Sequence, residues 1–193
     1  LAPHASAVLM DPVWTHPHHL RAVPGRVGLI STLEDYGFEL VGGERRSHAI
    51  EGWSVAKIRR SGAMGVKLLA WHRPDLSEAT LAHQDAFVEA VGRACEEHDL
   101  PFVLELLVYP LPSEDPGSAA YARAKPERVL GSLRRYADPR FRVDLMKLEF
   151  PVELKRVDGF HAGALDGVAR EPVHDLDETR AHDAELITKV RSY

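Results

Sequence analysis

Asp-Leu-Met-Lys-Leu-Glu-Phe-Pro, residues 144–151, has the pattern of a short buried strand, although charged side chains interrupt its apolar run. Lys147 and Glu149 are two residues apart, so both side chains point to the same side of the strand. Taking a charge out of water costs free energy unless the charge is paired. We therefore expect these side chains to meet charged partners.

Two earlier apolar stretches each contain one ionisable residue in the same way. Residues 65–71, Gly-Val-Lys-Leu-Leu-Ala-Trp, contain Lys67, and residues 102–109, Phe-Val-Leu-Glu-Leu-Leu-Val-Tyr, contain Glu105. Three apolar strands that are each interrupted by charge indicate a shared polar site, because each charged side chain can then pair with one of opposite sign. The alternative is a buried network of lysine–glutamate pairs, Glu149 included, with a purely structural role.

Apolar runs and amphipathic runs alternate along the whole chain. Strands are predicted at 5–10, 27–33, 65–71, 102–109 and 144–151, and helices at 53–61, 77–98 and 118–136. The alternation predicts repeated βα units, and hence an α/β fold whose parallel sheet is buried on both faces. Residues 37–52 and 152–170 are expected to be loops, and 177–190 a polar helix. Pro126 is expected to kink the last of the three helices or to break it in two.

The composition limits the class of protein. The chain has 193 residues, a net charge of -5 with acidic and basic residues interspersed, and one cysteine, Cys95. We expect one domain with no nucleic-acid or membrane partner, a small-molecule ligand and a homo-oligomer. Cys95 lies on the apolar face of a predicted helix, which indicates core packing, and the lack of a disulfide framework fits a cytoplasmic location. His16, His18 and His19 have no cysteine or carboxylate at a zinc-site spacing, so no metal site is predicted.

Two lysines and a glutamate in one low-dielectric site suit Schiff-base chemistry on a carbonyl substrate. An amine attacks a ketone only when it is unprotonated, and lysine in water has a pKa of about 10.4, so the site must lower that pKa. Burial disfavours the ammonium ion, and a second cation nearby disfavours it further. On this reasoning Lys67 is the second cation, and Glu105 is the carboxylate that moves protons.

Several separated motifs resemble the class I tagatose 1,6-bisphosphate aldolases. The motifs are residues 62–69 (Gly-Ala-Met-Gly-Val-Lys-Leu-Leu), 101–105 (Pro-Phe-Val-Leu-Glu), 124–127 (Ala-Lys-Pro-Glu) and 143–152 (Val-Asp-Leu-Met-Lys-Leu-Glu-Phe-Pro-Val), with support from 5–12 and 53–57. The resemblance implies a TIM (β/α)8 barrel that cleaves tagatose 1,6-bisphosphate to dihydroxyacetone phosphate and glyceraldehyde 3-phosphate. It also implies that the reaction needs no metal and no other cofactor.

The resemblance assigns roles to individual residues. Lys147 matches the Schiff-base lysine of the family, Glu105 its acid/base glutamate and Lys67 a further active-site lysine. Apart from the resemblance, their charge and their place in the chain make Asp11, Arg73, Lys125 and Glu149 candidate substrate contacts. For three of these there is an alternative, because Asp11 can form a turn before a proline, and the two basic residues can be solvated surface charges.

The chain also departs from the family in two ways. Residues 68–73 resemble the related sulfofructose 1-phosphate aldolases more closely. Cleavage of sulfofructose 1-phosphate is therefore an alternative function. The matched region would begin at the second barrel strand and end after the sixth, so about five of the eight βα units are evident. Residues 1–193 are therefore expected to form a single barrel domain that is incomplete at both ends. A sugar-phosphate-binding remnant or sensor without catalysis is the remaining alternative.

Overall fold

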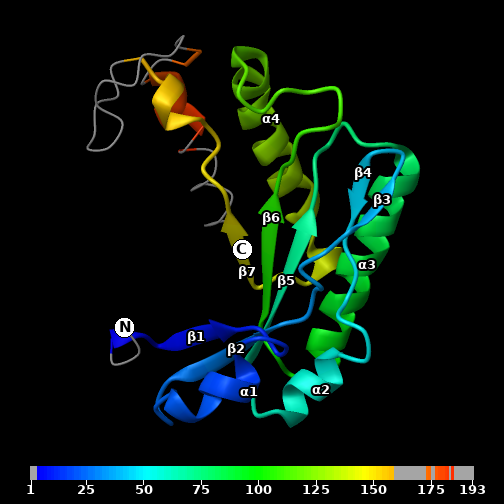
Figure 1. Cartoon of the computed structure of the whole chain (residues 1–193), viewed down its shortest axis with the longest axis vertical. Helices are drawn as coiled ribbons and strands as arrows, with labels where there is room; N and C mark the ends of the chain where they lie inside the picture. The colour runs from blue at the N-terminus through cyan, green and yellow to red at the C-terminus, as the bar shows by residue number, and fades with distance from the viewer. Residues whose placement is uncertain (1–3, 159–172, 175–176, 183, 185–193) are drawn as a thin grey trace.

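A computed structural model of the chain describes residues 4–158, 173–174, 177–182 and 184. Five strands form one sheet in the order β1-β2-β5-β6-β7, and all neighbouring strands run parallel. They are β1 (Ala7–Met10), β2 (Gly28–Thr32), β5 (Gly65–Trp71), β6 (Phe102–Leu107) and β7 (Leu145–Leu148). Figure 1 shows the strand direction turning strongly from β1 to β7. The predicted parallel sheet of five strands is confirmed.

Helices follow the strands in the expected alternation. A short helix, α1 (His16–His19), and a 3-10 turn, η2 (Leu20–Ala22), lie between β1 and β2. The longer helices are α2 (Val55–Arg60), α3 (Glu78–Glu97) and α4 (Ala119–Tyr136). Each of these begins after a serine, Ser54, Ser77 or Ser118, whose side chain accepts a hydrogen bond from a backbone N–H three residues later. Further 3-10 turns are η3 (Pro139–Phe141) and η4 (Leu154–Arg156).

Pro126 lies inside α4, and the helix continues through it. The predicted alternative of two separate helices is therefore wrong. Proline has no N–H, so the carbonyl oxygen of Ala122, four residues earlier, lacks its usual helical donor. The ring of His174 fills this role, because its Nε2 lies 3.2 Å from that oxygen, and a carbonyl can only accept a hydrogen bond.

The core lies on one face of the sheet, where alternate residues of the central strands meet the helices. On β5 and β6 these residues are 3% exposed or less; they are Val66, Leu68, Ala70, Phe102, Leu104 and Leu106. They form one cluster with Ile58 of α2 and with Val88 and Cys95 of α3. Cys95 is buried as predicted, and burial raises the pKa of its thiol to about 12.

The outer strands are less buried than the sequence indicated. Residues of β1 and β7 alternate between exposed and half-buried, so the prediction of strands buried on both faces is wrong for them. The physical reason is their place in the sheet, since among the described residues each pairs with a strand on one side only. Leu9 and Leu145 are 46% and 56% exposed as a result.

A hairpin occupies the segment 37–52, which the sequence analysis predicted to be a loop. Its strands are β3 (Glu39–Val41) and β4 (Glu44–Arg46), and the turn between them uses Gly42 and Gly43 at φ values of 61° and 85°. Two successive residues with positive φ give the tight turn that suits the twist of a hairpin. The strands were missed because each is only three residues long and β4 consists of charged residues alone.

The end of the chain is described only in part. Residues 177–182 are helical, in agreement with the prediction, and the other residues of the predicted helix 177–190 lie almost entirely outside the described residues. The predicted loop 152–170 contains η4 at its start, and 159–172 lie outside the described residues. No helix in the described part of the chain is long and apolar enough to cross a membrane.

Candidate active site

The register of the sheet brings the three predicted catalytic residues together. Glu105 of β6 and Lys147 of β7 are register partners, and Lys67 lies on the neighbouring strand β5, opposite Val103. Register partners point to the same side of a parallel sheet, and so do residues two apart on one strand. All three side chains therefore lie on the face opposite the core.

Glu105 binds both lysines. Its Oε2 lies 2.8 Å from Nζ of Lys67, and its Oε1 accepts a hydrogen bond from Nζ of Lys147. The side chains of Lys67 and Glu105 are 7% and 12% exposed, so this part of the site is shielded from water. The structure thus places the three residues in one polar cluster, and their catalytic roles stay predictions.

Lys147 is less buried than the sequence indicated. Its side chain is 56% exposed, so the prediction of a buried lysine in a buried strand is wrong in this structure. The apolar residues around Lys147 suggested burial, but among the described residues β7 has a neighbouring strand, β6, on one side only. The carboxylate of Glu105, by contrast, is shielded, and it fixes the position of the Lys147 ammonium group.

Glu34 is a fourth member of the cluster, and the sequence analysis gave it no role. It comes two residues after the end of β2, and its Oε1 lies 2.5 Å from Nζ of Lys67. Thr32 is the register partner of Lys67, so a side chain two residues later points to the same face. The signal in the sequence was an acid just beyond the carboxyl end of an apolar strand, where parallel sheets bind ligands, whereas its burial became clear only in the structure.

The two carboxyl groups have pKa values that are shifted in opposite directions. Burial raises the pKa of Glu34, and the charge and hydrogen bond of Lys67 offset this effect only in part. Burial also acts to raise the pKa of Glu105, but hydrogen bonds from Lys147 and Lys67 outweigh it and hold the pKa below its usual value. Glu105 is therefore the carboxyl group that stays ionised more readily.

Asp11 lies in a turn after β1. Its Oδ1 accepts hydrogen bonds from the backbone N–H groups of Val13 and Trp14, at 2.7 and 2.9 Å. Its Oδ2 accepts a hydrogen bond from Thr32 Oγ1 at 3.2 Å. The geometry agrees with the turn-forming alternative, and a contact between Asp11 and the substrate stays a prediction.

Lys125 and Glu149 bind each other at the carboxyl ends of β6 and β7. Nζ of Lys125 lies 3.1 Å from Glu149 Oε2 and 3.1 Å from Glu153 Oε1. The side chain of Lys125 is 12% exposed, so the alternative of a solvated surface charge is wrong. Glu149 also accepts a hydrogen bond from the backbone N–H of Val108 at 2.6 Å. A role for the pair in binding the substrate stays a prediction.

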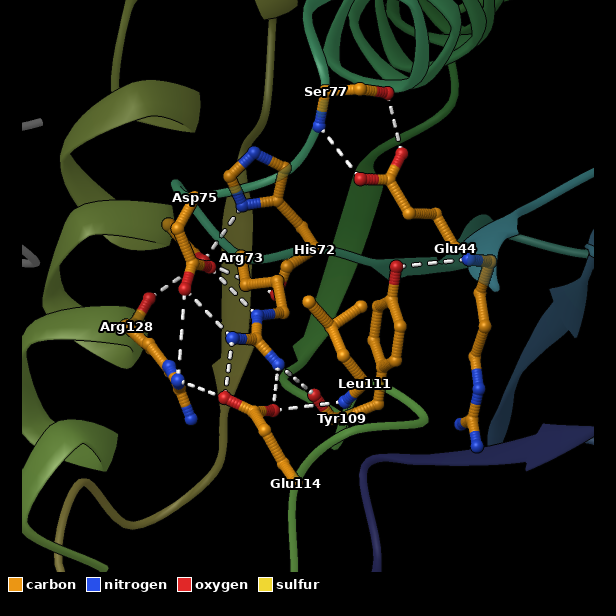
Figure 2. Close-up of polar contacts among 11 residues, drawn as sticks. Glu44, His72, Arg73, Asp75, Ser77, Tyr109, Leu111, Glu114 and Arg128 are labelled. Carbon is orange, nitrogen blue, oxygen red and sulfur yellow. Dashed lines mark hydrogen bonds and ion pairs between the residues drawn. The ribbon is translucent and has the colours of Figure 1, made fainter. Parts of the chain in front are cut away.

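Arg73 is the centre of a separate ion-pair cluster in the loops after β5 and β6 (Figure 2). It is 1% exposed, so the alternative of a solvated surface charge is wrong here too. Its guanidinium donates two hydrogen bonds to Asp75, two to Glu114 and one to the carbonyl of Tyr109. Arg128 of α4 lies 3.6 Å from Asp75 and also binds Glu114. All five donors of Arg73 are occupied, so an anion could bind only by displacing one of these partners.

No metal site is found among the described residues. No group of three or more histidine, cysteine, aspartate or glutamate side chains in that part of the chain is placed to hold an ion. His18 and His19 have rings 6.3 Å apart in edge-to-face contact, and His16 makes a similar contact with Trp53 at 6.4 Å.

A protein-family model described as DeoC/LacD family aldolase matches residues 1–185. The tagatose 1,6-diphosphate aldolase of Streptococcus pneumoniae is 35% identical over 163 residues, which are 84% of this chain and 50% of that protein. The tagatose 1,6-diphosphate aldolase 2 of Streptococcus agalactiae is 35% identical over 181 residues, which are 94% of this chain and 53% of that protein. The chain spans about half the length of the curated relatives it matches.

A solved structure supports the predicted fold. The crystal structure of an archaeal fructose 1,6-bisphosphate aldolase superposes with a TM-score of 0.50 at 17% identity, and covers 78% of this chain and 52% of that chain. At this identity the similarity shows the fold alone. The predicted α/β class, with about five strands of a TIM-type barrel, is confirmed. Since the family model matches nearly the whole sequence, the chain belongs to the DeoC/LacD family of aldolases.

Proposed function

We propose that this protein is a class I aldolase that cleaves tagatose 1,6-bisphosphate to dihydroxyacetone phosphate and glyceraldehyde 3-phosphate. The observation that carries the proposal is the carboxylate of Glu105, whose two oxygens bind the ammonium groups of Lys67 and Lys147. A lysine in contact with a proton-accepting carboxylate is the pair that Schiff-base formation requires. The names of the matched relatives support the choice of substrate.

In the proposed reaction, Nζ of Lys147 attacks the C2 carbonyl carbon of the ketose. Its ammonium group must first lose a proton, and Glu105 is in contact to accept it. The resulting carbinolamine loses water to give an imine with the substrate. Glu105 gives its proton to the hydroxyl group that leaves as this water, and the carboxylate so restored accepts the proton of the C4 hydroxyl. The C3–C4 bond breaks, and its electron pair moves into the imine to form an enamine. The aldehyde leaves, the enamine gains a proton at C3, and water releases the second product from Lys147.

Lys67 has a supporting role in this proposal. Its ammonium group lies between Glu34 and Glu105, and its side chain is 7% exposed. The positive charge favours the ionised form of Glu105, which is the form that accepts the proton of Lys147. Because Lys67 binds Oε2 of Glu105, the other oxygen, Oε1, is the one that contacts the proposed nucleophile, Lys147.

Trapping with borohydride tests the proposal. Dihydroxyacetone phosphate is added to the protein, the imine is reduced, and the modified residue is located by intact mass and peptide mapping. We expect one stable adduct on Lys147, which Lys147→Ala abolishes. Lys57→Ala is the matched control, because it removes an exposed lysine on α2 and should leave the adduct unchanged.

A folded protein that gives no adduct, or an adduct elsewhere, contradicts the proposal. Binding of tagatose 1,6-bisphosphate without any adduct would instead support a non-catalytic sugar-phosphate sensor. Parallel cleavage assays with sulfofructose 1-phosphate distinguish the related substrate. That comparison does not depend on the trapping result, because it measures the preference for the group at C6.

We further propose that copies of the chain associate and that the reaction takes place in the cytoplasm. The outer strands β1 and β7 support association, because an outer strand presents backbone N–H and C=O groups that a further chain can bind. The single cysteine, which is free and buried in the core, is compatible with a reducing compartment. Light scattering coupled to gel filtration tests the first point, and a mass equal to one chain would contradict it.

A further inference from the structure

Glu34 is placed on the reactive face of the sheet but has no part in the reaction as proposed above. It is 7% exposed, and it holds Lys67 through Oε1 only. Its second oxygen, Oε2, is buried and has no hydrogen-bond partner among the described residues. The backbone N–H of Leu69 is near enough to favour the charged form of the group, but no hydrogen bond to Oε2 forms.

A buried carboxyl oxygen without a partner costs free energy, so it calls for an explanation. Burial raises the pKa of Glu34, whereas two lysines lower the pKa of Glu105. A pair of carboxyl groups with opposite shifts is the pattern seen where two acids have different roles in one reaction.

The position of Glu34 relative to Lys147 indicates which part of the substrate it meets. The carboxyl group follows β2, and Lys147 is on β7, with β5 and β6 between them. Three strand spacings correspond to about 14 Å between the backbones, and side chains that point inward shorten this gap. The chain of contacts runs from Glu34 through Lys67 and Glu105 to Lys147.

A ketose bound through C2 to Lys147 places its first three carbons beside that lysine. The inference takes the carbons beyond C3, which become the aldehyde, to extend from Lys147 along this line of polar side chains toward β5 and β2. The hydroxyl groups on these carbons are donors that suit a free carboxyl oxygen. A dihydroxyacetone phosphate molecule has no such carbons and does not extend that far.

We propose that Glu34 is a further substrate-binding residue, whose Oε2 accepts a hydrogen bond from a hydroxyl group on the aldehyde half of the ketose phosphate. The inference rests on the proposed function, because it takes Lys147 as the residue that binds C2. In this proposal Glu34 recognises the part of the sugar that lies beyond the C3–C4 bond and leaves as the aldehyde. Glu105 and Lys147 then act on the three-carbon part that remains bound to Lys147.

The test uses the Glu34→Gln variant and measures two steps separately, namely imine formation with dihydroxyacetone phosphate and cleavage of the whole ketose bisphosphate. Glutamine keeps the size of the side chain, and its amide oxygen can still accept the hydrogen bond of Lys67. It cannot present a second acceptor to the sugar. We expect borohydride trapping of dihydroxyacetone phosphate to stay within about twofold of the original protein. We expect kcat/KM for cleavage of tagatose 1,6-bisphosphate to fall at least tenfold, the equivalent of about 1.4 kcal/mol.

Glu39→Gln is the matched control, since it makes the same chemical change at an exposed position of β3. Thermal unfolding by circular dichroism checks that both variants fold. Equal losses in trapping and in cleavage for Glu34→Gln would overturn the inference, because Glu34 would then act only through Lys67. Unchanged cleavage would overturn it as well. A lack of adduct in the original protein would overturn the proposed function itself, and is thus distinguishable from both results.

Discussion

Arg73→Lys keeps the positive charge of the ion-pair cluster after β5 but removes the geometry of the guanidinium group. Arg73 donates five hydrogen bonds, to Asp75, Glu114 and the carbonyl of Tyr109. A lysine ammonium group has only three donors. At least two of these five hydrogen bonds are therefore lost, and a site in which Arg73 is 1% exposed gives water little access to replace them.

The size of the loss follows from these contacts. A hydrogen bond to a charged group contributes about 1.5 to 3 kcal/mol, so two lost bonds correspond to about 3 to 6 kcal/mol. Asp75 has a side chain that is 48% exposed and can regain water, whereas Glu114 is 22% exposed. We therefore expect the lower end, about 3 kcal/mol, out of a total stability that is typically about 5 to 15 kcal/mol.

Urea unfolding, followed by tryptophan fluorescence, measures this change in the free energy of unfolding. Arg93→Lys is the control, because Arg93 forms an exposed pair with Glu89 one helical turn away and should lose less than about 0.5 kcal/mol. A loss below about 1 kcal/mol for Arg73→Lys would refute the structural role. If substrate affinity fell while stability held, Arg73 would instead be a substrate contact, as the sequence analysis allowed.

Two further predictions concern stability. The hydrogen bonds from Arg73 lower the pKa of Glu114 to about 2 from its ordinary value of 4.5, so its contribution to stability is complete above pH 4.5 and is lost as the pH falls toward 2. Urea unfolding as a function of pH should show a shallower acid loss in Glu114→Gln, and identical slopes would contradict this. Gly92→Ala should cost about 1 to 3 kcal/mol despite the better helix propensity of alanine, because its Cβ would lie 2.1 Å from the Phe141 carbonyl oxygen. Gly25→Ala, which meets no atom within 4 Å, is the control, and equal melting temperatures would contradict the clash.

The central strands could be predicted because local pattern and tertiary environment agree there. Residues 65–71 and 102–107 are apolar on the side that packs against α3, and the one ionisable residue in each lies on the other side. The cost of burying a charge made Lys67 and Glu105 stand out in the sequence. The same cost required a partner for each, which the adjacent strand supplies.

The hairpin 39–46 could not be predicted from the local sequence pattern. Its strands are held by contacts that are distant in sequence, since the guanidinium of Arg45 lies 4.3 to 4.8 Å from the ring centroids of Phe38, Trp71 and Tyr109. The backbone N–H of Arg45 also donates to the hydroxyl group of Tyr109. Only the two glycines of the turn were a local signal, and three-residue strands are too short for a periodic pattern.

The burial of Lys147 and the burial of Glu34 were not predicted correctly, for one common reason. The exposure of a side chain depends on the residues that surround it in the fold, and these are distant in the sequence. Lys147 has apolar residues on either side in sequence, yet more than half of its side chain is exposed because β7 is an outer strand. Glu34 begins a polar run, Glu-Asp-Tyr-Gly, which is typical of an exposed loop, yet β5 and its lysine bury it. The environment of a charge inside a central apolar strand can therefore be predicted from the sequence, whereas the burial of a charge just beyond a strand, such as Glu34, cannot. The ends of strands are also where parallel sheets bind ligands, so the burial of acids at these positions matters for a candidate site and has to be read from the structure.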